Sequence, residues 1–118
     1  MNQIKRALSI GGVISNVHSW SSKPFTDKNG TQWKGAQIDL LIDRADEVIN
    51  ICEMKFVSDK YVIDSEYEER LRNRTSLFRA VTKTKKSIQH TFITTYGIVQ
   101  NLHSGIVQSE VVMDDLFL

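Results

Sequence analysis

The hydrophobic pattern of this chain follows the two-residue period of β-strands over most of its length. Alternation and runs of β-type residues predict strands over residues 13–20, 35–43, 47–57, 87–98 and 106–113. The second and third strands are separated only by Arg44, Ala45 and Asp46. Because so short a connection suits a tight turn, we expect these two strands to form an antiparallel hairpin.

Two other segments follow the period of a helix. Apolar residues at helical spacing predict a short helix over residues 2–10, which two glycines can end. A longer helix is expected over residues 64–85, with Asp64 or Ser65 as its N-cap. The apolar stripe of this helix consists of Tyr67, Leu71, Phe78 and Val81. The element order is therefore α-β-β-β-α-β-β, which is typical of an α/β fold.

The segment over residues 21–34 fits neither pattern. It has few apolar side chains, holds the only proline of the chain, and contains an Asn29-Gly30 turn signal. We predict a polar, mobile loop here.

Size and charge narrow the class of protein. The 118 residues suit a single domain over residues 1–118. With 15 Lys and Arg against 14 Asp and Glu, the net charge is +1, which argues against a wholly basic nucleic-acid-coating protein. A single cysteine and the absence of a secretory pattern predict a cytoplasmic protein. No apolar run approaches the roughly 20 residues that span a bilayer, so we expect no membrane partner.

The predicted hairpin carries the strongest chemical signal. Glu53 and Lys55 are two residues apart, so they point to the same face of their strand. Asp39 interrupts the apolar run of the preceding strand, and a turn centred near Asp46 would place it opposite Glu53. Two adjacent carboxylates repel each other unless a cation lies between them, and Mg²⁺ or Mn²⁺ suits that position. Lys55 could then orient a nucleophile or stabilise charge during phosphodiester hydrolysis.

A plainer interpretation is also open. Glu-x-Lys is a common pair, and both residues together with Asp39 could be ordinary polar positions on a half-exposed strand. We favour the catalytic interpretation because Asp39 lies in an Ile/Leu-rich strand at hairpin distance from Glu53.

The same residues resemble the PD-(D/E)XK nuclease superfamily, and more closely the nuclease-like C-terminal domain of bacterial AAA-type ATPases. The resemblance covers almost the whole chain. It is carried by residues 35–43 (GAQIDLLID), 52–55 (CEMK), 82–85 (TKTK), 93–97 (ITTYG) and 114–117 (DDLF). It implies a restriction-endonuclease-like αβββαβ core with a mixed central sheet flanked by helices. It also implies an ATPase domain upstream. This chain itself has no Gly-x-x-x-x-Gly-Lys-Ser/Thr motif, so we expect no ATP site in it.

By that resemblance, Asp39 and Glu53 are metal ligands, the Met54 carbonyl is a third, and Lys55 is the catalytic lysine. Active members of the superfamily often add an acidic residue from the first helix, whereas residues 1–12 contain none. This departure supports an alternative function, a catalytically inactive nuclease-fold module that docks nucleic acid or protein or forms an oligomer. The β-rich segment 106–113 could pair edge to edge in such a homo-oligomer.

The second helix and its C-terminal end are strongly basic. Seven Lys and Arg residues and no acidic residue lie between residues 70 and 90. The candidate nucleic-acid contacts are Arg72, Arg74, Arg79, Lys83 and Lys86. Four of them, Arg72, Arg79, Lys83 and Lys86, form a basic stripe opposite the apolar one. A solvated helix face is an equally good interpretation of this basic stripe. Arg74 falls on the apolar side, where we expect its stem to lie along the core with the guanidinium in water. The alternative is that Arg74 points over the sheet toward Asp39 or Glu53, or toward a substrate phosphate.

Other reactive residue types give weaker signals. Cys52 alternates with Met54 and Phe56 on the presumed core face, so we expect it to be a buried apolar residue and not a nucleophile. The three histidines have no spacing typical of zinc sites. Trp20 and Trp33 flank the polar loop and could stack on bases, although anchoring the loop to the core is the more frequent use of such residues.

Overall fold

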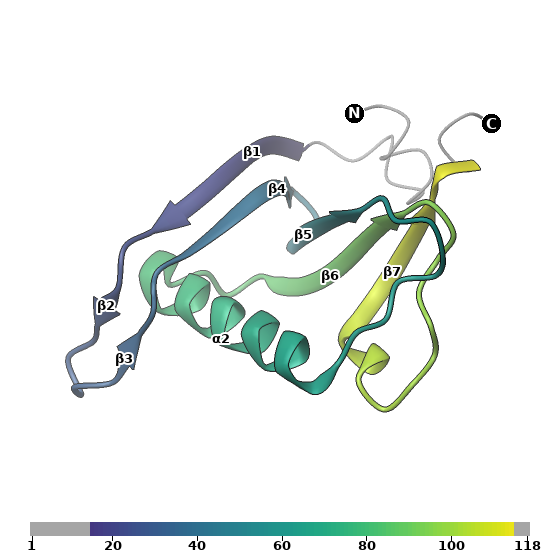
Figure 1. Ribbon diagram of the computed structural model, residues 1–118. Coiled ribbons are helices and arrows are strands. Elements are labelled where there is room, and N and C mark those ends of the chain that lie inside the picture. Colours follow the sequence, from purple (N-terminus) through teal and green to yellow (C-terminus); the bar gives the residue numbers. More distant parts are fainter. Residues whose placement is uncertain (1–14, 115–118) are drawn as a thin grey trace.

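A five-stranded mixed sheet forms the centre of the protein, as seen in a computed structural model that describes residues 15–114 (Figure 1). The strands lie in the order β1-β4-β5-β6-β7. Their bounds are β1 (Ser15–Ser22), β4 (Ala36–Arg44), β5 (Val48–Lys55), β6 (Ser87–Thr94) and β7 (Val107–Val112). The pairs β1·β4 and β4·β5 are antiparallel, whereas β5·β6 and β6·β7 are parallel. The predicted α/β class is confirmed at this level, and the helix expected over residues 2–10 lies outside the described residues.

The β4·β5 hairpin has the register that the sequence predicts. Asp43 pairs with Ile49, which centres the turn on Asp46. Arg44 closes the turn by donating from its guanidinium to the Asp46 carboxylate, with an Nε–Oδ1 distance of 2.9 Å. Glu47 takes a φ of 68°, the left-handed conformation that ends a three-residue hairpin loop.

Helix α2 (Ser65–Thr82) connects β5 to β6 and covers one face of the sheet (Figure 1). Of the two predicted caps, Asp64 is the one used, because its carboxylate accepts a hydrogen bond from the Tyr67 backbone N–H at 2.8 Å. The helix ends three residues before its predicted limit of residue 85. The reason is that Lys83 adopts a left-handed conformation with a φ of 57° and closes the last turn by donating to the Arg79 carbonyl.

Two apolar clusters lie beneath α2. The first contains Ile63, Tyr67, Leu71, Phe92, Ile98 and Ile106. The second contains Ile38, Leu41, Ile49, Ile51 and Phe78. The helix therefore contributes to the first cluster near its start and to the second near its end. Leu77 is buried although the predicted stripe omitted it, and Val81, which the stripe included, is 36% exposed in the last turn.

A β-bulge in β4 changes the direction of its first residues. His18 of β1 pairs with Leu41, but Trp20 pairs with Ile38, so Asp39 and Leu40 together oppose a single residue of β1. In a regular strand, residues three positions apart point to opposite faces. Because the bulge adds one residue, Ile38 and Leu41 lie in the same apolar cluster.

The segment predicted to be a loop contains a small two-stranded sheet instead. Strands β2 (Phe25–Thr26) and β3 (Gln32–Trp33) pair antiparallel and project beyond the ends of β1 and β4 (Figure 1). The Asp27 carboxylate accepts hydrogen bonds from the backbone N–H groups of Asn29 and Thr31, both at 2.9 Å. The predicted Asn29-Gly30 turn is therefore present, but it closes an ordered hairpin.

No helix within residues 15–114 is long and apolar enough to cross a membrane.

His90 makes stability depend on pH. The side chain is 5% exposed, and its Nε2 lies 3.0 Å from the Thr75 hydroxyl. Burial, reinforced by the charges of Arg74 and Arg72, lowers the pKa of His90 from 6.5 to about 4. Between these values the unfolded chain binds the additional proton, so stability is lost as the pH falls through this window. We expect the free energy of unfolding to drop by roughly 2 kcal/mol between about pH 7.5 and pH 5.

Urea unfolding at both pH values measures this drop. A His90→Gln variant should lose most of the pH dependence, while His18→Gln, which alters an exposed histidine, should keep it. An equal drop in wild type and His90→Gln would show that other groups are responsible.

Candidate functional site

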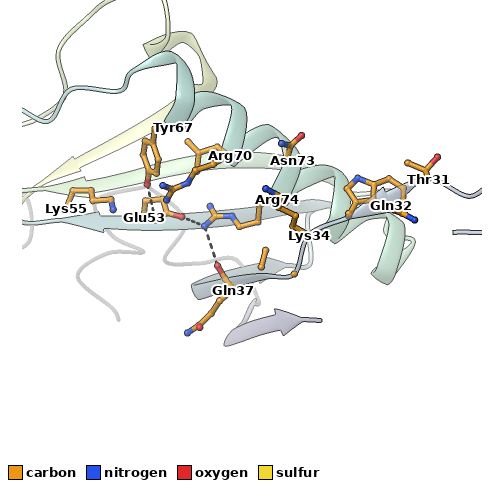
Figure 2. Close-up of a pocket in the computed structure, with 14 residues that line it drawn as sticks. Thr31, Gln32, Lys34, Gln37, Glu53, Lys55, Tyr67, Arg70, Asn73 and Arg74 are labelled. Carbon is orange, nitrogen blue, oxygen red and sulfur yellow. Dashed lines mark hydrogen bonds and ion pairs between the residues drawn. The ribbon is translucent and has the colours of Figure 1, made fainter. Parts of the chain in front are cut away.

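A pocket of about 810 Å³ lies between α2, the end of β5 and the segment that joins β3 to β4 (Figure 2). Strand β5 contributes Glu53 and Lys55, which share a face as the sequence predicts. Helix α2 contributes Tyr67, Arg70 and Arg74. These three α2 residues are three and four positions apart, so they project from one side of the helix. The pocket is therefore formed where the helix crosses the end of the hairpin.

Glu53 is held by two residues of α2. Arg74 forms an ion pair with its carboxylate, and the Tyr67 hydroxyl donates to Oε2 at 3.4 Å. The Glu53 and Arg74 side chains are only 16% and 13% exposed. Burial, followed by the Glu53 charge, raises the pKa of Tyr67, so its hydroxyl stays protonated and remains a donor. Our expectation that the Arg74 guanidinium lies in water is wrong, because the sheet beneath α2 supplies a carboxylate. The alternative, that Arg74 points over the sheet toward Glu53, is confirmed.

The Arg74 guanidinium also has unused hydrogen-bonding capacity. Its Nη1 donates weakly to the Gln37 carbonyl at 3.4 Å, whereas Nε and Nη2 are buried without a hydrogen-bond partner among the described residues. An unsatisfied buried donor costs about 1–3 kcal/mol. Both nitrogens are covered by neighbouring atoms, so a ligand in the pocket would reach them only after a side-chain movement.

Lys55 lies over aromatic rings. Its Nζ is 5.1 Å from the centre of the Tyr67 ring and 5.6 Å from that of Tyr61. The Arg70 guanidinium carbon is 5.2 Å from the Tyr67 ring centre. These cation–π contacts keep both charges at the pocket without neutralising them.

The charges of the pocket are unbalanced. Lys34 on the opposite wall adds a fourth cation, against the single carboxylate of Glu53. Within residues 15–114, Lys34, Lys55 and Arg70 form no ion pair. Since Arg74 already neutralises Glu53, the other three cations give the pocket a net positive charge. Such a site favours an anion.

The structure does not bring Asp39 into this pocket. Its exposed side chain accepts a hydrogen bond from Gln37 Nε2 at 2.8 Å. In Figure 2 the Gln37 side chain points away from Glu53, while its backbone oxygen faces Arg74. Pairing between β4 and β5 extends only to Leu40 and Cys52, one residue short of Asp39 and Glu53. The bulge at Asp39 and Leu40 accounts for this change of direction.

As they lie, these residues do not form a ligand set for Mg²⁺ or Mn²⁺. Within residues 15–114, no three His, Cys, Asp or Glu side chains are grouped closely enough to hold a metal ion. Glu53 is paired with Arg74, and Asp39 lies outside the pocket. The divalent cation therefore stays a prediction from the sequence.

Most of the predicted basic stripe has structural partners. Arg72 pairs with Glu68 one turn earlier, and Arg79 donates to the backbone oxygens of Thr84 and Lys86. The Lys86 ammonium donates to Asp43 and to the Arg44 carbonyl at 2.7 Å each. Arg79 and Lys86 thus hold the connection between α2 and β6. Of the five candidate contacts, only Arg74 lines the pocket, whereas Lys83 is exposed at the end of the helix.

Sequence reasoning did not single out Arg70, Tyr67 or Lys34 as site residues. The first two had a usable signal, since Tyr67, Arg70 and Arg74 repeat at helical spacing on the side that meets Glu53. Lys34 had none, because its position depends on how the hairpin β2·β3 is placed.

Cys52 is a buried core residue, as expected. It is 2% exposed, and burial raises the pKa of its thiol to about 12. The placement of Met54 and Phe56 on the core face is wrong, because they are 43% and 53% exposed. Phe56 lies beyond the last residue of β5, where the sheet no longer covers it.

Comparisons with known proteins support the fold only. No protein-family model and no curated protein match this chain. The crystal structure of AF1548, a protein of unknown function, is similar, with a TM-score of 0.55 and 14% identity. The similarity covers 98% of this chain and 61% of that chain. This chain therefore spans less than two thirds of AF1548, and at this identity the similarity concerns the backbone arrangement.

The Glu53–Arg74 pair predicts unequal effects of two arginine substitutions. Arg74→Met leaves the Glu53 carboxylate without a counter-charge between helix and sheet, so we expect a loss of about 2–3 kcal/mol in the free energy of unfolding. Arg72→Met removes a pair whose arginine side chain is 64% exposed, and should change stability by less than about 1 kcal/mol.

Urea denaturation of both variants tests this difference. Adding Glu53→Gln to Arg74→Met should recover part of the lost stability, since the uncompensated charge is then removed. Equal losses in the two single variants would contradict the central role of the pair.

Proposed function

We propose that this protein is a nuclease-like domain that binds nucleic-acid phosphodiesters in the pocket beneath α2. The observation that carries this proposal is the charge of the pocket. Lys34, Lys55 and Arg70 form no ion pair with any residue that the structure describes, and Arg74 neutralises Glu53. A phosphodiester is an anion with several acceptor oxygens, so it matches both the charge and the free donors.

The residues would divide the task of phosphate binding. Arg74 is paired with Glu53 and neutralises its carboxylate, so this carboxylate does not oppose an anion at the other cations of the pocket. Arg70 and Lys55 both lie against the Tyr67 ring at one end of the pocket, where their long side chains can move to contact a phosphate. Binding of this kind positions the backbone and does not by itself read base sequence.

Metal-dependent hydrolysis is the second candidate function. It is favoured by the presence of Glu53 and Lys55 side by side in the pocket, which are two of the three residues that the sequence predicts as catalytic. For Mg²⁺ or Mn²⁺ to bind there, Glu53 would have to exchange Arg74 for the metal ion, and Asp39 would have to turn towards the pocket. If this exchange does not occur, the domain is a docking module that retains the nuclease fold.

Two partners suggested by the sequence extend the proposal. We propose an ATPase domain upstream of this chain, on the basis of the sequence resemblance. The second proposed partner is another copy of this chain. This proposal is supported by the position of β7 at the edge of the described sheet, where a second copy could add a strand. Mass measurement in solution distinguishes a monomer from such an oligomer.

Loss of pocket cations should weaken oligonucleotide binding. We expect Lys55→Ala and Arg70→Ala each to reduce affinity roughly tenfold and to lower the salt dependence by about one released ion. Lys83→Ala serves as the matched control on the exposed end of α2 and should have little effect. Fluorescence anisotropy with a labelled oligonucleotide at several salt concentrations measures both quantities.

Two results would contradict pocket binding. One is the absence of binding at low salt. The other is a loss of affinity in Lys83→Ala that exceeds the losses in the pocket variants, which would indicate the basic stripe as the binding surface.

Nuclease assays separate the two candidate functions. If the domain is a metal-dependent nuclease, Mg²⁺ or Mn²⁺ should support cleavage of DNA or RNA, and Asp39→Ala and Lys55→Ala should abolish it. Binding without cleavage under all conditions favours the docking module. Cleavage that is equal in wild type and both variants would exclude this site as its source.

Titration calorimetry with Mn²⁺ adds an independent reading. Because Arg74 competes for Glu53, Arg74→Met should bind Mn²⁺ more tightly than wild type if Glu53 is a ligand. Unchanged binding would show that the metal, if bound, lies elsewhere.

A further inference from the structure

The small hairpin β2·β3 and the segment that follows it supply a wall of the pocket, and this wall contains an aromatic side chain that phosphate binding does not require. Every residue from 31 to 37 borders the cavity, including Trp33 of β3. The Trp33 ring stacks on Phe25 of β2 with 6.1 Å between ring centres and 26° between planes. Trp33 is only partly buried, so an indole with a supporting ring is accessible beside the cavity.

The hairpin is held in a fixed position. A Cβ at Gly35 would lie 2.8 Å from the Ser22 carbonyl oxygen, so only glycine permits this approach of the chain at the base of the hairpin. At the other end, the Asp27 carboxylate accepts the two backbone hydrogen bonds that close the turn. Trp33 is therefore positioned before any ligand binds, which reduces the entropy lost on binding.

The two ends of the pocket differ in chemistry. Figure 2 shows Lys55, Glu53 and Tyr67 at one end and Thr31 and Gln32 at the other. The charged end suits a phosphate. At the opposite end the hydrogen-bonding groups are neutral, since Gln32 and Thr31 lie there.

The Gln32 amide and that of Asn73 on α2 have no side-chain hydrogen-bond partner among the described residues. Such amides donate and accept, as the edge of a nucleobase does.

We propose that the pocket binds an unpaired nucleotide of single-stranded nucleic acid. The base lies on Trp33 with its edge near Gln32 and Asn73, and its phosphate lies towards Lys55 and Arg70. This inference rests on the proposed function and specifies its substrate class. A base inside a duplex is stacked and paired, so it cannot reach an aromatic platform within a pocket, whereas every unpaired base has a free π-face.

Three oligonucleotides of equal length test this inference: a single strand, an abasic single strand and a duplex, each prepared as DNA and as RNA. We expect the single strand to bind roughly tenfold more tightly than the abasic strand and the duplex, in the range of one base–aromatic stacking contact. Trp33→Ala should abolish this preference, so that the single strand and the abasic strand bind this variant with equal affinity. Trp33→Tyr should retain part of it, because a ring remains.

Trp20→Phe is the matched control. The chain has two tryptophans, and the Trp20 ring packs edge-on against Phe78 in the core, 5.0 Å between centres. The preference for single strands should persist in this variant. Quenching of the remaining tryptophan, Trp33, on addition of the single strand but not of the abasic strand would support stacking directly.

The outcomes separate the two proposals. Equal binding of all three oligonucleotides, unchanged by Trp33→Ala, overturns the single-strand inference and leaves phosphodiester binding intact. A preference for single strands that survives Trp33→Ala also overturns it, because the base then stacks elsewhere. Binding of none of the oligonucleotides contradicts the proposed function itself, and with it the inference.

Discussion

The ion pair between Glu53 and Arg74 joins the helix to the sheet at the point on which the pocket depends. It lies where α2 passes from one apolar cluster to the other, so neither charge is well solvated. A carboxylate and a guanidinium in such a place must remain together, because separating them leaves a charge with little solvent. The pair thereby fixes the direction of Arg74, while burial, followed by the Glu53 charge, raises the pKa of Tyr67 and keeps its hydroxyl protonated. It also leaves Lys55 and Arg70 as uncompensated charges beside a pocket whose single acid is already neutralised.

The bulge in β4 imposes the second constraint. One additional residue in this strand lets Ile38 and Leu41 share a core cluster, but it also turns Asp39 out of the pocket. Catalysis by a carboxylate pair would require both acids on one face, and packing of the core opposes that arrangement at Asp39. The same backbone thus supports an apolar core and a positively charged pocket, and it separates the acids that a metal ion would need.

The hairpin β2·β3 shows how a segment without a hydrophobic pattern can still be ordered. Its own core is limited to the stacked rings of Phe25 and Trp33, and its remaining support comes from the turn at Asp27 and the close approach at Gly35. These are interactions of single residues and not of a repeated pattern. Hydrophobic periodicity could therefore not reveal this hairpin, although the Asn29-Gly30 signal correctly placed its turn.

The sequence alone predicted the five strands of the central sheet and helix α2, the hairpin centred on Asp46, Asp64 as one of two candidate caps, and the placement of Glu53 and Lys55 on one face. All of these follow from local periodicity or from turn and cap chemistry within a few residues. Tertiary structure alone decided the direction of Asp39, the partner of Arg74 and the position of Lys34. Each of these depends on a contact between segments distant in the chain: β1 with β4, α2 with β5, and the hairpin with α2. A local pattern fixes which face of a strand or helix a side chain occupies. The partner that it meets on that face is set by how the elements pack. The chemistry of this pocket depends on those partners.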